Sequence, residues 1–302
     1  MSANAALILE SAARLAVPLL LVAMGELIAE KAGALNISVE AGMLAGAFGA
    51  ALGSDITDST ALGLLIGIAC GVAVALVQAY LSHALTVNQF VVGLSLNVFV
   101  LGLTSFLHAS IEMESLQFGV LRIPVLADVP VVGEALFAQR VPFYAAYLLV
   151  PAVWWVLNRT RWGLEVQAAG EDPRAADISG LDVAKLRRQA TILGGACAGL
   201  GGAYLSIGAI GGFSQNMVAG RGFIAIAAII IGGWSVRGTL LGCALFGLMD
   251  ALRLALPAIG IELNPQLLIA SPYLMALVAM LLFSRSLRQP RALGLDFVRR
   301  SG

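Results

Sequence analysis

Charged side chains are scarce in this sequence. Only 12% of its 302 residues are Asp, Glu, Lys or Arg, whereas 59% are hydrophobic. A soluble globular chain carries about a quarter charged residues, so the composition excludes an ordinary soluble domain. The apolar runs are long, rich in Leu, Ala and Gly, and show no alternation of period two, so they predict membrane-spanning helices rather than strands.

Residue types that several kinds of chemistry require are also few. The only lysines are Lys31 and Lys185, and neither follows a glycine, which excludes a Gly-Lys-Ser/Thr phosphate loop and hence an ATPase. The three cysteines, Cys70, Cys197 and Cys243, lie far apart in apolar runs and form no disulfide or metal-binding pattern. We therefore expect neither an enzyme nor a bound cofactor or metal.

Two further classes are disfavoured. The net charge is zero and no basic stripe with interleaved aromatics is present, so we expect no nucleic-acid partner. The N-terminus lacks a basic start followed by a small-residue cleavage site, so we expect no removable signal peptide.

The positive charges that are present gather in two segments. Residues 158–188 hold six of the eighteen Lys and Arg, and the tail after Phe283 holds five more. The positive-inside rule places both segments in the cytoplasm. We therefore predict a cytoplasmic loop at 159–188 and a cytoplasmic tail at 285–302, joined in a single transmembrane domain that covers residues 1–302.

An all-α bundle of about eight to ten membrane helices follows from the apolar runs. Two cytoplasmic segments must be separated by an even number of crossings, so the run from 222 to 252 is expected to split at residues 232–235. This count puts residues 111–140 and the N-terminus outside. The expected helices are 7–29, 38–54, 60–81, 87–110, 141–158, 189–211, 222–234, 236–252 and 266–284.

Small residues recur at helical spacing in these runs. Five sets of glycines are separated by four residues, and such spacing lets helix backbones approach closely in a membrane. We therefore expect a tightly packed bundle. Separately, Asp250 and Arg253 are three residues apart at the end of one expected helix, so we expect their side chains to pair. The glycine sets are Gly42 and Gly46; Gly63, Gly67 and Gly71; Gly195 and Gly199; Gly208 and Gly212; Gly238 and Gly242.

Polar side chains within the apolar runs are candidates for a translocation path, because buried polar groups in a membrane tend to face a cavity or a partner. Glu26 and Glu40 flank Asn36, and Gly33 and Asn36 are expected to interrupt the helix there. For Glu40 and Asn36 a path and an interhelical hydrogen-bond network are both open. The path candidates are Asn36, Glu40, Asn88, Asn97, Gln215 and Arg221. Few charges and several amides favour a neutral polar solute, with an ion-coupled secondary carrier as the rival.

Three blocks of this sequence resemble the permease subunit of ATP-binding-cassette importers for simple sugars and nucleosides, a group related to branched-chain amino-acid permeases. Residues 25–40, GELIAEKAGALNISVE, resemble GE..ER.GvLNiGvEG, with Ser38 where glycine is usual. Residues 163–180 resemble G..iRAvGeNp.AA...Gi, with Gln167 and Asp172 replacing arginine and asparagine. Residues 220–234 resemble GrGFiAlA..ifG.w. The resemblance covers residues 20–250 in order.

This resemblance implies a fold like that of type II importers and a multi-pass place in a bacterial cytoplasmic membrane. In the family, the 163–180 block forms short helices that dock on the ATPase subunit. By resemblance, the docking residues here are Gly170, Glu171, Asp172, Pro173, Ala175, Ala176 and Gly180.

The partners implied are an ATP-binding-cassette ATPase, a second and longer permease in a heterodimer, and a periplasmic or lipid-anchored binding protein. The expected cargo is a nucleoside or simple sugar, the nucleoside group being the nearest in the first block. A branched-chain amino-acid permease is the alternative within the same family.

Overall fold

A computed structural model describes residues 2–114, 116–124, 126–129, 133–258 and 289–297, with isolated positions at 266, 270, 274, 277–278 and 281. Most of these residues are helical and very few lie in strands, which confirms the all-α polytopic fold. Six of the described helical segments are long and apolar enough to cross a membrane: Leu7–Lys31, Thr60–His83, Gln89–Ser110, Val141–Arg159, Val183–Ile210 and Val236–Leu256. Most of the expected helix 266–284 and half of the tail 285–302 lie outside the described residues.

The elements follow the chain in this order. The first half contains α1 (Ser2–Lys31), α2 (Val39–Thr57), α3 (Thr60–His83), α4 (Gln89–Ser110), β1 (Val120–Arg122), α5 (Gly133–Phe137) and β2 (Ala138–Arg140). The second half contains the 3₁₀ turn η1 (Val141–Tyr144), α6 (Ala145–Arg159), α7 (Arg161–Glu171), α8 (Pro173–Ile178), α9 (Val183–Ala203), the π-helix η2 (Tyr204–Ile210), α10 (Arg221–Ile231) and α11 (Val236–Ala258).

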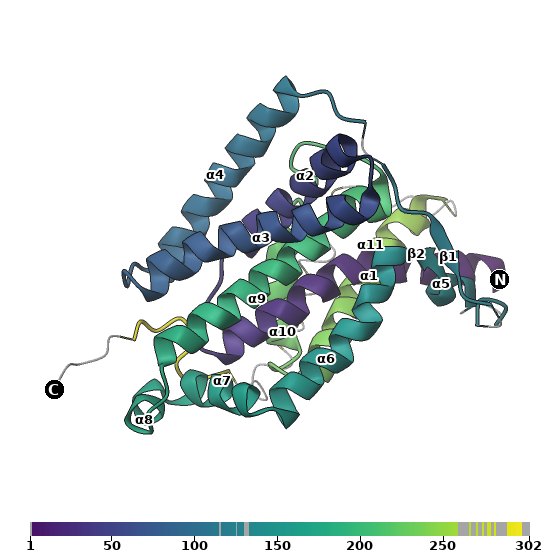
Figure 1. Ribbon diagram of the computed structural model, residues 1–302. Helices are drawn as coiled ribbons and strands as arrows, with labels where there is room; N and C mark the ends of the chain where they lie inside the picture. The colour runs from purple at the N-terminus through teal and green to yellow at the C-terminus, as the bar shows by residue number, and fades with distance from the viewer. Residues whose placement is uncertain are drawn as a thin grey trace.

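Helices α1 and α9 lie at the centre of the bundle (Figure 1). α1 packs against both α9 and α11, and α2 packs against both α3 and α9. The short helices α7 and α8 lie at one end of the bundle, which we call the α7–α8 end. The N-terminus, α5 and the β1–β2 hairpin lie at the other, which we call the hairpin end. Polar sites at the two ends are therefore separated by the length of the bundle.

Glycines bring α2, α3 and α9 into backbone contact. A Cβ atom added at Gly46 would lie 2.5 Å from the Cα of Gly199, and one added at Gly67 would lie 2.7 Å from the carbonyl oxygen of Gly46. A Cβ atom at Gly71 would likewise meet the Cα of Gly199, at 2.6 Å. No side chain larger than hydrogen fits at these crossings, which confirms the close packing expected from the glycine spacing.

The break between α10 and α11 falls where it was predicted. Gly233 and Trp234 have φ angles of +61° and +51°, a left-handed conformation that ends the helix before α11 begins at Val236. The predicted pair on α11 is also confirmed, because Arg253 lies 3.5 Å from Asp250.

Two local features differ from the sequence-based expectation. Helix α9 begins at Val183, before the expected start at 189, because the side chain of Asp182 accepts a hydrogen bond from the amide of Lys185 and caps it. The expected outer segment 111–140 contains the short antiparallel pair β1–β2, in which Leu121 faces Gln139. Neither the cap nor a three-residue strand changes the hydrophobic pattern on which the predictions were based.

Candidate functional site

The chain leaves the helical conformation between α1 and α2, as predicted from Gly33 and Asn36. Gly33 has a φ of +81°. The amide group of Asn36 is buried, and both its backbone N–H and its side-chain N–H₂ donate to the carboxylate of Glu26, at 3.2 and 3.0 Å. The hydroxyl of Ser38 donates to the Asn36 oxygen at 2.7 Å. For Asn36 the geometry therefore favours a closed interhelical network.

Glu40 connects the start of α2 to the start of α10. Its two carboxylate oxygens accept hydrogen bonds from the backbone amides of Gly220 and Gly222, each at 2.7 Å. A carboxylate at a helix N-terminus pairs with amides that have no partner within the helix and with the positive end of the helix dipole. The negative charge of Glu40 is therefore compensated chiefly by backbone amides, with a smaller contribution from the charge of Arg221.

A cavity of about 210 Å³ opens beside this carboxylate. Asn97, on α4, fastens the adjacent backbone: its side chain donates to the carbonyl of Ile37 at 3.0 Å and accepts from the amide of Ala41 at 2.9 Å. The cavity therefore combines a few polar groups with mostly apolar walls, as small-molecule sites do. Its lining consists of Glu40, Ala41, Leu44, Asn97, Val98, Leu101, Asn216, Gly220 and Phe223.

The other predicted path residues lie around this cavity or away from it. Gln215 donates to the hydroxyl of Ser105 at 3.1 Å, and Arg221 donates to the carbonyl of Met217 at 2.9 Å, so both hold the loop that precedes α10. The exposed Asn88 accepts from two backbone amides and caps α4. Of the six candidates, the structure brings Glu40 and Asn97 together at the cavity.

The predicted docking segment forms two helices joined at a sharp corner. Asp172 accepts hydrogen bonds from the amides of Arg174 and Ala175, both at 3.0 Å, and Pro173 is the first residue of α8. Glu171, Asp172, Ala175 and Gly180 are exposed, Pro173 is half-buried, and Gly170 and Ala176 are buried. The seven predicted docking residues thus divide into an outward surface and an inward packing face.

Sequence reasoning missed one prominent residue of this segment. Ile178, the last residue of α8, is 87% exposed. It is a highly accessible apolar side chain at a corner that otherwise presents mostly polar and charged residues. Gln167, at the position where the resembled family carries arginine, is turned inward and donates to the carbonyl of Leu157 at 2.6 Å.

A buried tryptophan joins the α10–α11 break to α1. The indole N–H of Trp234 donates to the carboxylate of Glu30, which is 1% exposed. The other carboxylate oxygen of Glu30 has no hydrogen-bond partner among the described residues. This contact escaped the sequence reasoning, although Glu30 and Trp234 both stand in blocks that carry the family resemblance.

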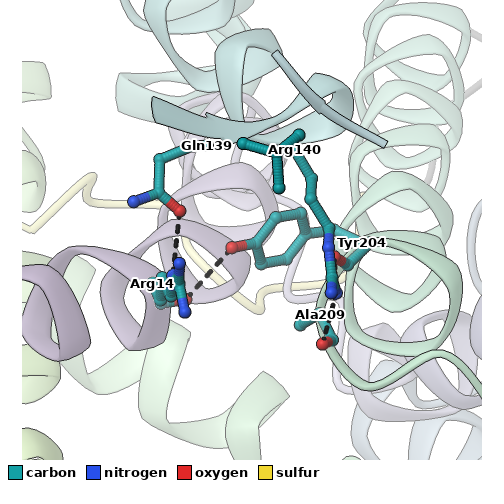
Figure 2. Close-up of a pocket in the computed structure, with 7 residues that line it drawn as sticks. Arg14, Gln139, Arg140, Tyr204 and Ala209 are labelled. Carbon is teal, nitrogen blue, oxygen red and sulfur yellow. Dashed lines mark hydrogen bonds between the residues drawn. The ribbon is translucent and has the colours of Figure 1, made fainter. Parts of the chain in front are cut away.

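A second polar cluster lies at the hairpin end, around a cavity of about 100 Å³ (Figure 2). Arg14 donates to the side chain of Gln139 at 2.9 Å, and the hydroxyl of Tyr204 donates to the carbonyl of Arg14 at 3.4 Å. Arg140 donates to the carbonyl oxygens of Gly208 and Ala209 at the end of the π-helix. Burial, and then the charge of Arg14, lower the pKa of Arg140.

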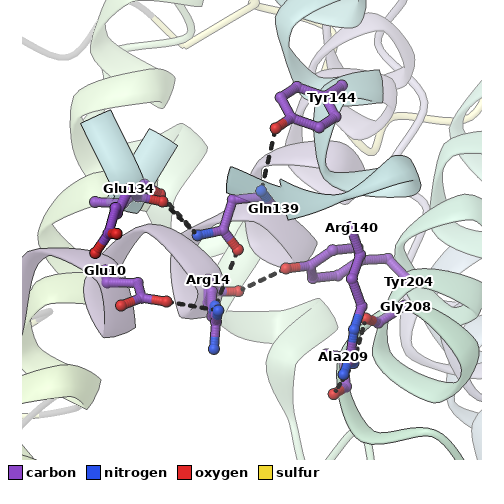
Figure 3. A network of polar contacts seen from close by, with 10 residues as sticks. Glu10, Arg14, Glu134, Gln139, Arg140, Tyr144, Tyr204, Gly208 and Ala209 are labelled. Atoms are coloured by element: carbon purple, nitrogen blue, oxygen red, sulfur yellow. Dashed lines mark hydrogen bonds and ion pairs between the residues drawn. The ribbon is translucent and has the colours of Figure 1, made fainter. Parts of the chain in front are cut away.

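The same cluster extends into the hairpin itself (Figure 3). Gln139 donates to the carbonyl of Glu134 at 3.3 Å, and its backbone amide donates to the Tyr144 hydroxyl at 3.1 Å. Arg14 also pairs with Glu10, one helical turn earlier. These bonds fasten the 111–140 segment to α1 and η2, and the cavity they leave is too small for a drug-sized solute.

Comparison with known proteins finds related permeases over most of the chain. The model of a family described as branched-chain amino acid transport system / permease component matches residues 8–284. The chain is 42% identical over 270 residues to the "Putative glucose ABC transporter permease protein TsgC13" of Haloferax volcanii, covering 86% of this chain and 81% of that protein.

Two relatives named for nucleosides match over nearly their full length. The nucleoside ABC transporter permease protein NupC of Lactococcus lactis is 30% identical over 299 residues, which is 93% of each chain. The guanosine ABC transporter permease protein NupQ of Bacillus subtilis is 30% identical over 302 residues, which is 94% of each chain.

Proposed function

The chain belongs to the branched-chain amino acid transport system permease family, and from this premise we propose that it carries a nucleoside or a simple sugar into the cell. Members of this family are membrane-spanning subunits of ATP-binding-cassette transporters, so the chain is a multi-pass protein of the cytoplasmic membrane and is not itself an enzyme. A separate ATPase subunit hydrolyses the ATP, and a substrate-binding protein delivers the cargo. Family membership thus removes the ion-coupled carrier as a rival.

The character of the cavity beside Glu40 supports a neutral cargo. Of the described lining residues, one carries a carboxylate, and it already accepts two backbone amide hydrogen bonds at 2.7 Å, so its charge is largely compensated before any solute arrives. An amino acid in its zwitterionic form would need a partner for each of its two charges. The face of Phe223, which is 41% exposed, suits the flat surface of a base or sugar ring.

The path we propose runs past this cavity. Glu40 and Asn97 line it, and Gln215 and Arg221 hold the loop that precedes α10. Asn36 and Asn88 do not line the cavity, and we propose that they support the path through the break and the start of α4. The cavity measures about 210 Å³, below the roughly 300 Å³ at which small-molecule sites begin. We propose that a second permease subunit supplies the opposite wall, in the heterodimer expected from the sequence.

We propose that α7 and α8 contact the ATPase through their outward surface. Glu171, Asp172 and Ala175 are exposed there, together with Ile178 at the tip of α8. Gly170 and Ala176 are buried and hold the corner, Pro173 is the first residue of α8, and Gly180 follows the residue that caps its end. The ATPase can move the bundle through this corner only if the exposed residues bind the ATPase and the buried residues pack firmly against the bundle.

Uptake into proteoliposomes tests this proposal. The permease, its ATPase, the second permease and the binding protein are reconstituted together, and accumulation of radiolabelled guanosine, glucose and leucine is measured with and without ATP. We expect ATP-dependent accumulation of guanosine or glucose. Accumulation of leucine alone, or uptake that needs an ion gradient rather than ATP, would overturn the proposal.

A further inference from the structure

A segment near the C-terminus folds back onto the α7–α8 end of the bundle. Residues 289–297, which we call the C-terminal strap, lie beside α7 as the yellow trace in Figure 1. The amide of Ala292 donates to the carbonyl of Gly170 at 2.9 Å, and the amide of Gly294 donates to the carbonyl of Gly33 at 3.1 Å. The strap thus bonds both the last turn of α7 and the break after α1.

One arginine side chain holds the strap and the break together. Arg187, on the first turns of α9, is 1% exposed and is the largest of the fully buried side chains. It donates to the carbonyl of Ala32 at 3.1 Å, to that of Leu295 at 2.7 Å and to that of Ala292 at 3.4 Å. A guanidinium group presents its donors in a rigid planar fork, so it fixes these carbonyls relative to one another.

Burying the cation of Arg187 is costly, and the opposite charge that interacts with it, Asp296, belongs to the strap itself. A buried charge is normally paired with an opposite charge, because removal from water costs several kcal/mol. Within the described part of the chain, the side chain of Arg187 donates to three backbone oxygens, one from the break and two from the strap. These oxygens lie where the strap meets the end of α1, the end of α7 and the start of α9, a region that we call the joint.

The joint allows little independent movement. A Cβ atom added at Gly170 would collide with the carbonyl oxygen of Lys31, so the end of α7 and the end of α1 touch through their backbones. No flexible side chain lies between these two ends to absorb a displacement. A shift of α7 must therefore move the break, the strap and the start of α9 together.

The break leads directly to the cavity. Residues 33–38 enter α2, whose first turn is held by Asn97 through Ile37 and Ala41. Glu40, on the same turn, holds the start of α10 through Gly220 and Gly222. Each step from Gly170 to the cavity is thus a hydrogen bond or a backbone contact.

We propose that Arg187 and the C-terminal strap form the joint that transmits movement of α7 and α8 to the break and so to the cavity. The inference rests on the proposed function, in which an ATPase pushes on α7 and α8. Arg187 is then a positioning residue, since it lies at the α7–α8 end and touches the path only through backbone. Without Arg187, we expect the rate of ATP hydrolysis to persist while the rate of solute transport falls.

The first experiment replaces Arg187 by Met, which keeps the length of the side chain and removes its donors. Reconstituted complexes are assayed for ATP hydrolysis and for uptake of radiolabelled guanosine or glucose, whichever the wild-type complex accumulates. We expect hydrolysis to persist and solute transported per ATP to fall about tenfold or more, since several charge-assisted hydrogen bonds are lost. Arg188→Met, which removes the neighbouring charge, should leave this ratio unchanged.

Two outcomes overturn the inference. An unchanged ratio in Arg187→Met would show that transmission does not need this joint. A parallel fall of hydrolysis and uptake, with normal assembly, would assign Arg187 a purely structural role. Absence of ATP-dependent uptake in the wild-type complex is a different result, because it would count against the proposed function and not against the joint.

A disulfide across the joint gives a second test that does not depend on Arg187→Met assembling. A Cβ atom at Gly294 would lie 3.7 Å from the Cβ of Leu35, within the spacing of about 3.5–4.5 Å that a disulfide requires. Because Gly294 has a φ of +73°, where a side chain is strained, the oxidised form is compared with the reduced form of the same variant. The pair Leu35→Cys and Gly294→Cys is introduced into a chain without its native cysteines. With Arg187 present, oxidation should leave transport per ATP unchanged, because the strap and the break move together.

The same pair provides a rescue experiment. In the Arg187→Met chain, oxidation should restore most of the lost transport per ATP, and reduction should abolish it again. Failure of a fully formed disulfide to restore coupling would mean that Arg187 acts elsewhere. Loss of transport on oxidation with Arg187 present would mean that the strap must leave the break, which also overturns the inference.

Discussion

At the scale of single residues, Glu40 serves two purposes at once. Its carboxylate caps α10 through Gly220 and Gly222, and it is the only acidic group among the described residues that line the cavity. The helix N-terminus compensates the charge, so the cavity keeps a strong hydrogen-bond acceptor without the field of an unpaired anion. That combination suits hydroxyl and N–H donors of a neutral solute.

Replacing Glu40 by Gln should weaken both the fold and the affinity for solute. The amide offers one acceptor where the carboxylate offers two, and hydrogen bonds to a charged group contribute about 1.5–3 kcal/mol each. We expect a lower midpoint of thermal unfolding and a higher KM for ATP-dependent uptake, both measured on the reconstituted complex.

Asp182→Ala is the control for this change, because alanine removes the helix cap whereas asparagine would preserve it. Asp182 also caps a helix, α9, by accepting from the amide of Lys185 at 2.9 Å, but it is exposed and does not line the cavity. Its replacement should lower stability with KM unchanged. An equal rise in KM for both variants would indicate that Glu40 acts only through the fold.

At the scale of elements, local signals determine how much was predictable. The corner at Pro173 was expected, because Asp172 and Pro173 are a cap and a first-turn residue whatever surrounds them. The exposure of Ile178 was not, because an apolar residue faces inward or outward according to which side of its helix is packed. Ala176, two residues earlier, is 5% exposed on the packed side.

Replacing Ile178 by Asp should release the ATPase subunit. An apolar side chain that is 87% exposed at the tip of α8 is a candidate anchor, and loss of an interface anchor costs about 2 kcal/mol or more. We expect at least a tenfold weaker association, measured by titrating the ATPase onto detergent-solubilised permease.

Ile56→Asp serves as the comparison for that titration. Ile56 lies in the last turn of α2 and is 72% exposed, so the same change is made to an equally accessible isoleucine on a different helix. It should leave ATPase binding intact. If Ile178→Asp bound the ATPase as tightly as Ile56→Asp, α8 would not be part of the contact.

At the scale of the whole molecule, contacts between distant segments are what the sequence could not supply. The break after α1 was predicted from Gly33 and Asn36, yet the bond from Arg187 to Ala32 joins residues 155 positions apart. Such a bond depends on how α1, α9 and the strap pack, and no periodicity encodes that packing. Likewise Glu40 and Asn97 were separate candidates until the fold brought them to one cavity.

The orientation of the molecule in the membrane is still a prediction, and single cysteines can test it. Ile178 at the α7–α8 end and Ile56 on α2 are both highly exposed, so thiol access at either depends on the side of the membrane rather than on burial. In a chain without its native cysteines, expressed without the ATPase subunit that would cover α8, Ile178→Cys should react with a membrane-impermeant maleimide only in permeabilised cells. Ile56→Cys should react in intact cells. Helix α2 begins at the break beside α7 and ends near the expected outer segment, where the amide of Glu114 donates to the side chain of Asp55.

The opposite labelling pattern would place α7 and α8 outside. An ATPase in the cytoplasm could then not reach them, and the basic residues of the 159–188 loop would lie on the side that the positive-inside rule disfavours. Because the strap bonds the end of α7 directly, residues 289–297 must share whichever side the loop occupies. A cysteine at exposed Leu295 should therefore label with Ile178→Cys and not with Ile56→Cys, which ties the side of the tail to the side of the loop in one experiment.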